Sequence, residues 1–244
     1  MKLIGHRGSA GTQPENTLAA FRAAWASRAD GIECDVRLTR DRQLAVIHDP
    51  TLERTFGLPK AVASTTFETL EALTSKHADG PLPLLEAVLR AAQPDHWCFI
   101  ELKTNAADPA FVPADYAAAL ERSLAAGAVP RAKIRLIAFD PFLLLSLKTA
   151  LPDLRSLWLP LPQLNPAALE TFWRSTVLSQ LDGIGHTRTL GPLPGDFLRH
   201  LETSGKERSV WTVNDSKEAR LYQENNYDFL TTDFPAKFAQ AIQS

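Results

Sequence analysis

Short apolar segments alternate with helical patterns along the whole 244-residue chain. The strand-like segments are residues 2–4, 31–36, 44–47, 97–102, 134–139, 154–159, 182–184, 209–213 and 229–232. The helical patterns cover residues 16–27, 84–92, 116–126, 142–150, 167–174, 197–204 and 217–224. This alternation predicts an α/β fold with a parallel sheet and helices outside it. The length fits a (β/α)8 TIM barrel, for which ~250 residues is typical. A doubly wound open sheet is the structural alternative.

Two features depart from regular alternation. There are more strand candidates than the eight places of such a barrel, and we expect 154–159 or 182–184 to be the surplus one. Only residues 37–43 separate the second and third candidates, which is too short for a crossover helix. Residues 49–80 have no clear place in the barrel. We therefore expect a single catalytic domain over residues 1–244, with 49–80 as a cap-like insertion after the third strand.

The composition excludes several classes of protein. The 26 basic and 28 acidic residues nearly balance, which argues against nucleic acid or an anionic membrane held by bulk charge. Two cysteines are too few for a disulfide framework, and no apolar run approaches the ~18 residues of a membrane span. We therefore expect a cytoplasmic protein.

Polar residues follow or end several of the expected strands, where the active site of a parallel barrel lies. Because side chains alternate along a strand, Glu33 and Asp35 share one face and Cys34 lies on the other. Glu101 and its neighbour Lys103 share a face in the same way. The apolar residues between them can pack under helices only if these carboxylates point into the barrel mouth.

Three inward carboxylates need compensation. Two unit charges ~4 Å apart repel by about 4 kcal/mol at an effective dielectric near 20. A hard divalent ion, Mg²⁺ or Ca²⁺, would relieve this repulsion between Glu33, Asp35 and Glu101. Ion pairs with Arg7 and Lys103 are the alternative.

Two histidines, His6 and His48, end the expected strands on either side of residues 31–36, if the first three strands are neighbours. Displacement at phosphorus needs a base on one side and an acid at the leaving group, and two imidazoles suit these roles. Arg7 and Lys103 supply cations for phosphate oxygens.

These residues lie in an ordered set of motifs that resembles the glycerophosphodiester phosphodiesterase family. The matching segments are Gly5-His6-Arg7-Gly8, Pro14-Glu15-Asn16-Thr17, Glu33-Cys34-Asp35, His48-Asp49, Leu52-Glu53-Arg54-Thr55, Pro81-Leu82-Pro83-Leu84-Leu85-Glu86, Glu101-Leu102-Lys103, Trp211-Thr212-Val213-Asn214 and Thr232-Asp233-Phe234-Pro235. The first motif alone would be a weak signal, but the ordered set is specific.

The resemblance implies a (β/α)8 barrel and metal-dependent hydrolysis of glycerophosphodiesters, the deacylated phospholipids, to sn-glycerol 3-phosphate and an alcohol. By position it implies one divalent cation, Mg²⁺ or Ca²⁺, bound by Glu33, Asp35 and Glu101, with His6 and His48 as the acid/base pair. It implies substrate binding by Arg7, Lys103, Glu15, Asn16, Phe139 and Trp211. The expected partner is a small-molecule glycerophosphodiester, with no nucleic acid and no stable membrane association. The sequence indicates no oligomeric state, head group or order of the two histidines.

The resemblance also implies that residues 49–80 cover the glycerol side of the pocket. Ala138 stands where the family usually has serine. His77, His96, His186 and His200 match no catalytic motif, although His186, just past a strand end, is a candidate for substrate contact. A lysophospholipase D or a lyase that stops at a cyclic phosphate is the alternative enzyme. A non-catalytic phosphodiester binder is the alternative outside enzymes.

Overall fold

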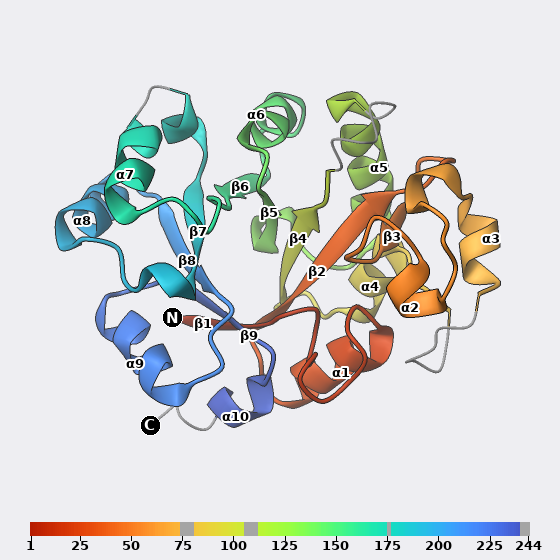
Figure 1. Ribbon diagram of the computed structural model, residues 1–244, viewed down its shortest axis with the longest axis horizontal. Coiled ribbons are helices and arrows are strands. Elements are labelled where there is room, and N and C mark those ends of the chain that lie inside the picture. The colour runs from red at the N-terminus through yellow and green to blue at the C-terminus, as the bar shows by residue number, and fades with distance from the viewer. Residues whose placement is uncertain (74–80, 105–111, 175–176, 240–244) are drawn as a thin grey trace.

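Eight parallel strands close into a barrel that is surrounded by helices in the computed structural model (Figure 1). The structure describes residues 1–73, 81–104, 112–174 and 177–239. The barrel strands are β1 (Lys2–Gly5), β2 (Gly31–Leu38), β4 (Trp97–Leu102), β5 (Ile134–Ala138), β6 (Arg155–Trp158), β7 (Gly183–Thr187), β8 (Glu207–Trp211) and β9 (Phe229–Thr232). The first strand pairs with both β9 and β2, which closes the barrel. The predicted TIM barrel is confirmed.

The helices that follow the strands form the outer layer (Figure 1). They are α1 (Leu18–Ala26), α4 (Leu85–Ala91), α5 (Pro113–Ala126), α6 (Pro141–Ala150), α7 (Pro166–Arg174), α8 (Gly195–Thr203), α9 (Ser216–Glu224) and α10 (Pro235–Ala239). Short polar side chains begin three of them: Thr17 caps α1, Asp140 caps α6 and Asp215 caps α9, each by accepting backbone N–H groups. No helix in the described part of the chain is long and apolar enough to cross a membrane.

The surplus strand is β3 (Leu44–Val46), and the expectation that it was 154–159 or 182–184 is wrong. This strand runs antiparallel to the far end of β2, with Val36 opposite Val46 and Leu38 opposite Leu44. A parallel pairing would need a crossover of a dozen or more residues, whereas a short loop allows only a hairpin. The neighbours of β2 within the barrel are therefore β1 and β4, and β3 pairs with the end of β2 outside the barrel.

Two apolar cores lie on the two faces of the barrel strands. The inner core fills the barrel and consists of Ile4, Phe99, Ile137, Leu157, Leu159 and Phe229. Cys34 and Cys98 belong instead to the larger core between strands and helices. The alternation predicted for β2 and β4 is confirmed, and it turns Glu33, Asp35 and Glu101 toward the barrel interior.

The described part of residues 49–80 forms a small unit beside β3, shown in orange in Figure 1. It contains α2 (Glu53–Phe56), a 3-10 turn (Val62–Ser64) and α3 (Phe67–Glu71). Its apolar residues pack on the face of β3 opposite to Leu44 and Val46, in a third core of Ala45, Ile47, Leu52, Phe56, Val62, Leu70 and Leu82. The insertion is thus attached to the barrel through β3.

Candidate active site at the mouth of the barrel

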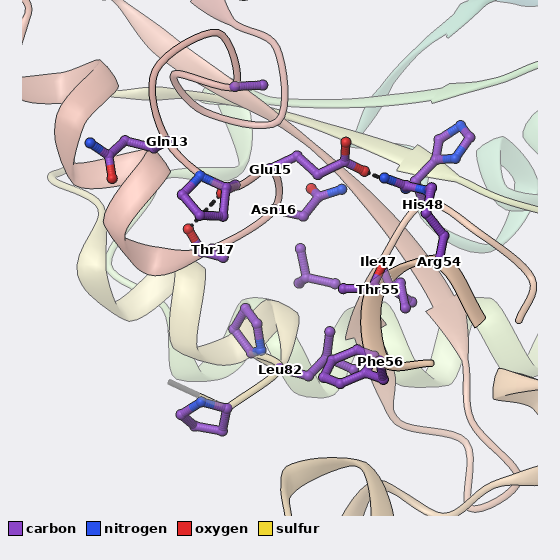
Figure 2. A pocket seen from close by; sticks show the side chains of 15 residues that line it. Gln13, Glu15, Asn16, Thr17, Ile47, His48, Arg54, Thr55, Phe56 and Leu82 are labelled. Carbon is purple, nitrogen blue, oxygen red and sulfur yellow. Dashed lines mark hydrogen bonds and ion pairs between the residues drawn. The ribbon is translucent and has the colours of Figure 1, made fainter. Parts of the chain in front are cut away.

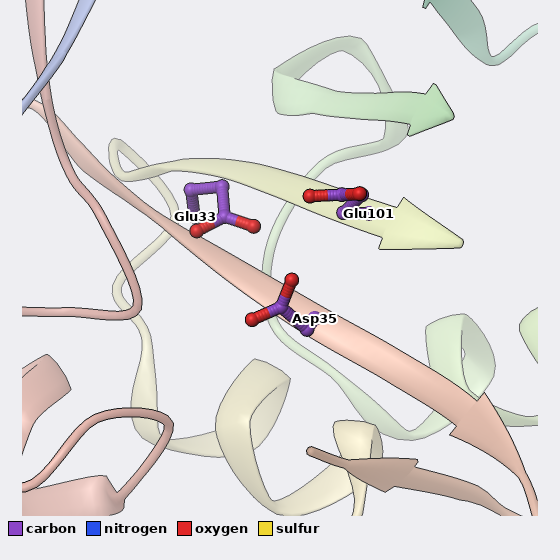
Figure 3. A group of neighbouring side chains, drawn as sticks. All are labelled: Glu33, Asp35 and Glu101. Atoms are coloured by element: carbon purple, nitrogen blue, oxygen red, sulfur yellow. The ribbon is translucent and has the colours of Figure 1, made fainter. Parts of the chain in front are cut away.

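Three carboxylates converge where β2 and β4 lie side by side (Figure 3). One oxygen from each of Glu33, Asp35 and Glu101 lies within 4.8 Å of the others, and all three side chains are buried. Asp35 is directly opposite Glu101 in the strand register, so the pairing of the two strands brings these groups together.

The burial of this cluster makes full ionisation unfavourable. Burial, together with the charges of Asp35 and Glu101, raises the pKa of Glu33 well above its usual range. Burial also raises the pKa of Glu101 to about 7, although Lys103 opposes the shift. At Asp35 the cations Lys103 and Arg7 outweigh burial and lower the pKa of the carboxyl. Asp35 is therefore firmly ionised, whereas Glu33 and Glu101 need a further positive charge nearby to be fully ionised.

Two cations enter the cluster but do not satisfy it. Lys103 Nζ lies 3.1 Å from Asp35 Oδ1 and 2.5 Å from Glu101 Oε1, and Arg7 Nε lies 3.1 Å from Asp35 Oδ2. The expected ion pairs are thus present. Even so, Glu33 Oε1 is buried and accepts no hydrogen bond from any described residue. Carboxylate oxygens are the ligands that hard divalent ions prefer, so this donor set fits such an ion.

A tight turn after β1 places His6 and Arg7 over the cluster. Arg7 has a φ of 49°, and its backbone N–H donates to Glu33 Oε2 at 2.9 Å. Gly8 follows with a φ of 85°, and a Cβ there would lie 2.5 Å from the carbonyl carbon of Ala20. Glycine at this position lets the turn pack against α1.

Each of the two expected histidines has a carboxylate at Nδ1. His6 Nδ1 lies 2.6 Å from Asp233 Oδ1, and His48 Nδ1 lies 2.7 Å from Asp49 Oδ1. Burial, opposed by nearby Asp35, lowers the pKa of His48. A carboxylate at one ring nitrogen fixes the tautomer and leaves the other nitrogen for proton transfer.

His48 reaches the mouth by a different route from the one expected. It follows β3, which returns toward the barrel from the far end of β2, and its carbonyl accepts a hydrogen bond from Arg37 Nε at 2.8 Å. The prediction that His48 ends a strand next to β2 holds, but that strand is the antiparallel hairpin strand and not part of the barrel.

Several residues that orient the histidines were not among the expected site residues. Asp49 accepts from Arg54 Nε at 2.5 Å, and this contact lowers the pKa of Asp49 to about 2. Asp233 accepts from Asn214 Nδ2 at 2.6 Å. All four residues lie inside the motifs quoted above, so their motif positions were the only available signal.

Glu15 and Asn16, from the loop before α1, form hydrogen bonds with charged residues of the site. Glu15 Oε1 accepts from Arg7 at 3.1 Å and from Arg54 at 2.7 Å. Asn16 Nδ2 donates to Asp35 Oδ2 at 2.7 Å, and its side-chain oxygen accepts from the Asp35 backbone N–H at 3.2 Å. Both residues therefore hold groups of the cluster in place.

A cavity of about 150 Å³ connects the charged groups with an apolar end. His6, Arg7, Glu33, His48, Glu101 and Lys103 line its charged part. At its apolar end, Phe139 and Trp211 meet edge to face with ring centroids 5.7 Å apart. The strand ends thus bring the expected histidines, cations and aromatic residues and two of the three expected carboxylates around one space, whereas Asp35 does not line it.

The match to a family model decides what kind of protein has this site. Residues 6–237 match the model of the Glycerophosphoryl diester phosphodiesterase family. The chain belongs to this family. The expected resemblance is confirmed, and so is the expectation that the chain is a phosphodiesterase.

Individual members of the family align over nearly the whole chain. The chain is 29% identical over 242 residues to YhdW of Bacillus subtilis, covering 96% of this chain and 95% of the relative. A glycerophosphodiester phosphodiesterase from Thermotoga maritima has a crystal structure with a TM-score of 0.80 at 28% identity, covering 98% of this chain and 96% of that one. A phosphodiesterase from Oleispira antarctica, solved with the product sn-glycerol-3-phosphate, has a TM-score of 0.83 at 22% identity, covering 100% and 97% of the two chains.

Part of the expected insertion, residues 49–80, lines a second cavity of about 210 Å³ (Figure 2). Arg54, Thr55 and Phe56 of α2 form one side, and the loop before α1 forms another. No described residue of 49–80 lines the cavity of about 150 Å³ at the barrel mouth, the catalytic cavity. The described part of the insertion therefore does not cover the glycerol side of that cavity as expected.

His186, the further candidate for substrate contact, lies outside the site. Its ring is fully buried under the helix layer, where Nδ1 lies 2.9 Å from the carbonyl of Thr187 and Nε2 lies 2.6 Å from the hydroxyl of Tyr227. The glycine before it, Gly185, lines the catalytic cavity instead. His77 lies outside the described residues.

Proposed function

We propose that this family member hydrolyses glycerophosphodiesters to sn-glycerol 3-phosphate and an alcohol, with one divalent cation, Mg²⁺ or Ca²⁺, and two histidines. The observation that carries the proposal is the single cavity lined by His6 and His48 together with Glu33 and Glu101 of the carboxylate cluster. A phosphodiester binder has no need for two histidines that are each oriented by a carboxylate. We further propose that residues 1–244 act as one catalytic domain and that the protein works in the cytoplasm, where its free thiols stay reduced.

Glu33, Asp35 and Glu101 would hold the cation through their inward oxygens. The bound ion supplies charge stabilisation for the phosphate oxygens and positions the substrate. The side-chain amide of Asn16 forms two hydrogen bonds with Asp35. Asn16 is therefore better placed to hold Asp35, a proposed ligand of the cation, than to touch the substrate. Glu15 similarly aims Arg7 into the cavity.

The substrate phosphate would lie between Arg7 and Lys103, which line the cavity beside the carboxylates. A guanidinium offers paired donors to phosphate oxygens, and an ammonium adds a point charge. The glycerol carbons would contact Phe139 and Trp211 at the apolar end of the cavity.

The two imidazoles would carry out the proton transfers. One removes the proton of the attacking hydroxyl or water, and the other donates its proton to the alkoxide oxygen that leaves phosphorus. Asp49 and Asp233 keep His48 and His6 in the tautomer that faces the substrate. Direct attack by water inverts phosphorus, whereas attack by the 2-hydroxyl followed by water gives overall retention, so a substrate chiral at phosphorus distinguishes the two routes.

The experiment that tests the proposal measures release of sn-glycerol 3-phosphate from glycerophosphocholine and glycerophosphoglycerol. Each reaction is run with EDTA and then with Mg²⁺ or Ca²⁺ restored. We expect product only with a restored cation, and we expect His6→Ala and His48→Ala to lose turnover. No product with either cation, or full turnover after either substitution, would contradict the proposal.

A further inference from the structure

The second cavity adjoins the catalytic cavity at a catalytic candidate. Among the described residues, His48 alone lines both cavities. Its Nδ1 is engaged with Asp49, and no described residue forms a hydrogen bond with Nε2. A group that leaves phosphorus on the His48 side would therefore lie next to a side chain that also lines the second cavity.

The volumes of the two cavities suggest that they act together. The catalytic cavity measures about 150 Å³ and the second about 210 Å³. Small-molecule sites usually enclose ~300–1,000 Å³. Neither cavity reaches this range alone, but the two together do. A diester has two halves joined at phosphorus, and the structure offers one compartment for each.

The walls of the second cavity are mostly apolar. Val46, Ile47, Phe56 and Leu82 line it together with Pro14, Pro81 and Pro83. Its charged pair, Glu15 and Arg54, is already joined at 2.7 Å, as Figure 2 shows. The Glu15 carboxylate also accepts from Arg7, so it is doubly compensated by cations.

This wall chemistry disfavours a cationic head group. A quaternary ammonium is recognised by an aromatic cage or by a carboxylate that it can neutralise. Among the described lining residues Phe56 is the one phenylalanine, and none is tyrosine or tryptophan, while the carboxylate of Glu15 is neutralised by arginine. Gln13 and Thr55 offer neutral polar groups that suit hydroxyls.

We propose that the second cavity receives the departing alcohol half of the substrate and that it favours an uncharged alcohol such as glycerol over choline. The inference rests on the proposed function and specifies which half of the diester goes where. The loop before α1 and the insertion would then set head-group preference, while the barrel interior sets preference for glycerol phosphate.

The test fills the second cavity without altering the catalytic one. In Leu82→Trp, an indole replaces a buried wall residue of the second cavity. Thr55→Tyr fills the same cavity from its partly exposed side, and it serves if Leu82→Trp does not fold. Leu221→Trp is the matched control, because this leucine is 43% exposed on α9 and lines neither cavity.

The probes are glycerophosphoglycerol, glycerophosphocholine and glycerophosphomethanol, whose leaving group is too small to need the second cavity. For the wild-type enzyme we expect a higher kcat/KM with glycerophosphoglycerol than with glycerophosphocholine. In the filled variants we expect the ratio of kcat/KM for glycerophosphoglycerol to that for glycerophosphomethanol to fall at least tenfold. The affinity for sn-glycerol 3-phosphate, measured by calorimetry, should change less than twofold, as should both rates in the control.

The outcomes separate the subsite from the proposed function. If the wild-type enzyme cleaves these diesters but the filled variants leave the ratio unchanged, the subsite is overturned and the function stands. A wild-type preference for choline over glycerol would overturn the inferred head-group class. If the wild-type enzyme cleaves none of the three probes with either cation, the proposed function itself is overturned.

Discussion

Asp233 Oδ1 lies 2.6 Å from His6 Nδ1, although 227 positions separate the two residues in the chain. On the proposed mechanism, this carboxylate accepts the Nδ1 proton and so presents Nε2 to the substrate. We expect Asp233→Asn to lower kcat by about 10²–10⁴, because an amide stabilises the wrong tautomer. Steady-state kinetics should show this loss, while cation affinity measured by calorimetry stays within twofold.

Asp228→Asn is the control for this substitution. Asp228 pairs with Arg208 at the opposite end of the barrel, away from the catalytic cavity. It should leave kcat nearly unchanged. An Asp233→Asn enzyme with normal kcat would show that His6 does not depend on its carboxylate.

Glu33 should destabilise the cation-free protein and should be needed for cation binding. Its pKa is raised by burial and by two like charges, so ionising it in the folded protein is unfavourable. We expect Glu33→Gln to raise the Tm of the cation-free protein by about 2–4 °C, the shift that ~1 kcal/mol produces at this size. Addition of Mg²⁺ or Ca²⁺ should raise the Tm of the wild-type protein and have little effect on the variant.

Differential scanning calorimetry with and without EDTA provides the measurement. Glu202→Gln, at a side chain that is 56% exposed, is the matched control and should respond to the cation as the wild-type protein does. A Glu33→Gln protein with a wild-type response to the cation would exclude Glu33 as a ligand.

His186 should make the fold sensitive to acid. Burial lowers its pKa to about 4 in the folded protein, whereas the unfolded value is about 6.5. A depressed folded pKa means that this contribution to stability is present above pH ~6.5 and is lost as the pH falls toward 4. The shift corresponds to a loss of about 3 kcal/mol.

Urea unfolding at pH 7 and at pH 4.5 tests this expectation. His186→Gln, which does not titrate, should have a smaller difference in the free energy of unfolding between the two pH values than the wild-type protein. Other groups titrate in the same range, but they are shared by both proteins and cancel in the comparison. Equal differences in the two proteins would contradict the expected role of His186.

Arg54 should affect catalysis more than stability. Its side chain is 49% exposed, and such ion pairs contribute only about 0–1 kcal/mol. Its contact with Asp49 lowers the pKa of that carboxyl to about 2, so Arg54→Met should raise this pKa. We expect about a tenfold loss of kcat. The acid limb of the pH profile should shift to higher pH, because Asp49 then becomes protonated, and no longer holds His48, at a higher pH.

Arg54→Lys should restore part of the activity, which loss of bulk alone would not explain. Arg131→Met is the control, since Arg131 pairs with Glu121 and Asp153 on the outer layer. An unchanged pH profile in Arg54→Met would show that Arg54 does not act through Asp49.

The sequence predicted the barrel strands well where burial and alternation coincide. The bounds of β4 and β9 agree with those expected, because a buried parallel strand between polar loops leaves a clear apolar segment. Alternation also placed Glu33, Asp35 and Glu101 on the inner face. Side chains along a strand point alternately to its two faces, and Cys34 and Cys98 pack outward against the helices.

Other features depend on contacts that no local pattern encodes. Apolar residues in β3 indicate a strand but not its direction, so the hairpin that delivers His48 was not predicted. The contacts of Asp233 and Arg54 join distant segments, and only folding reveals them. The insertion packs on β3, so the position of its described part also depends on the direction of that strand.

The pairing of β1 with β9 has a consequence for the timing of activity during protein synthesis. His6 leaves the ribosome 227 residues before Asp233, the carboxylate that contacts its Nδ1. A nascent chain that has not yet released Asp233 cannot set the tautomer of His6. On the proposed mechanism, efficient cleavage of diesters therefore begins only after translation has passed Asp233 and β9 has paired with β1.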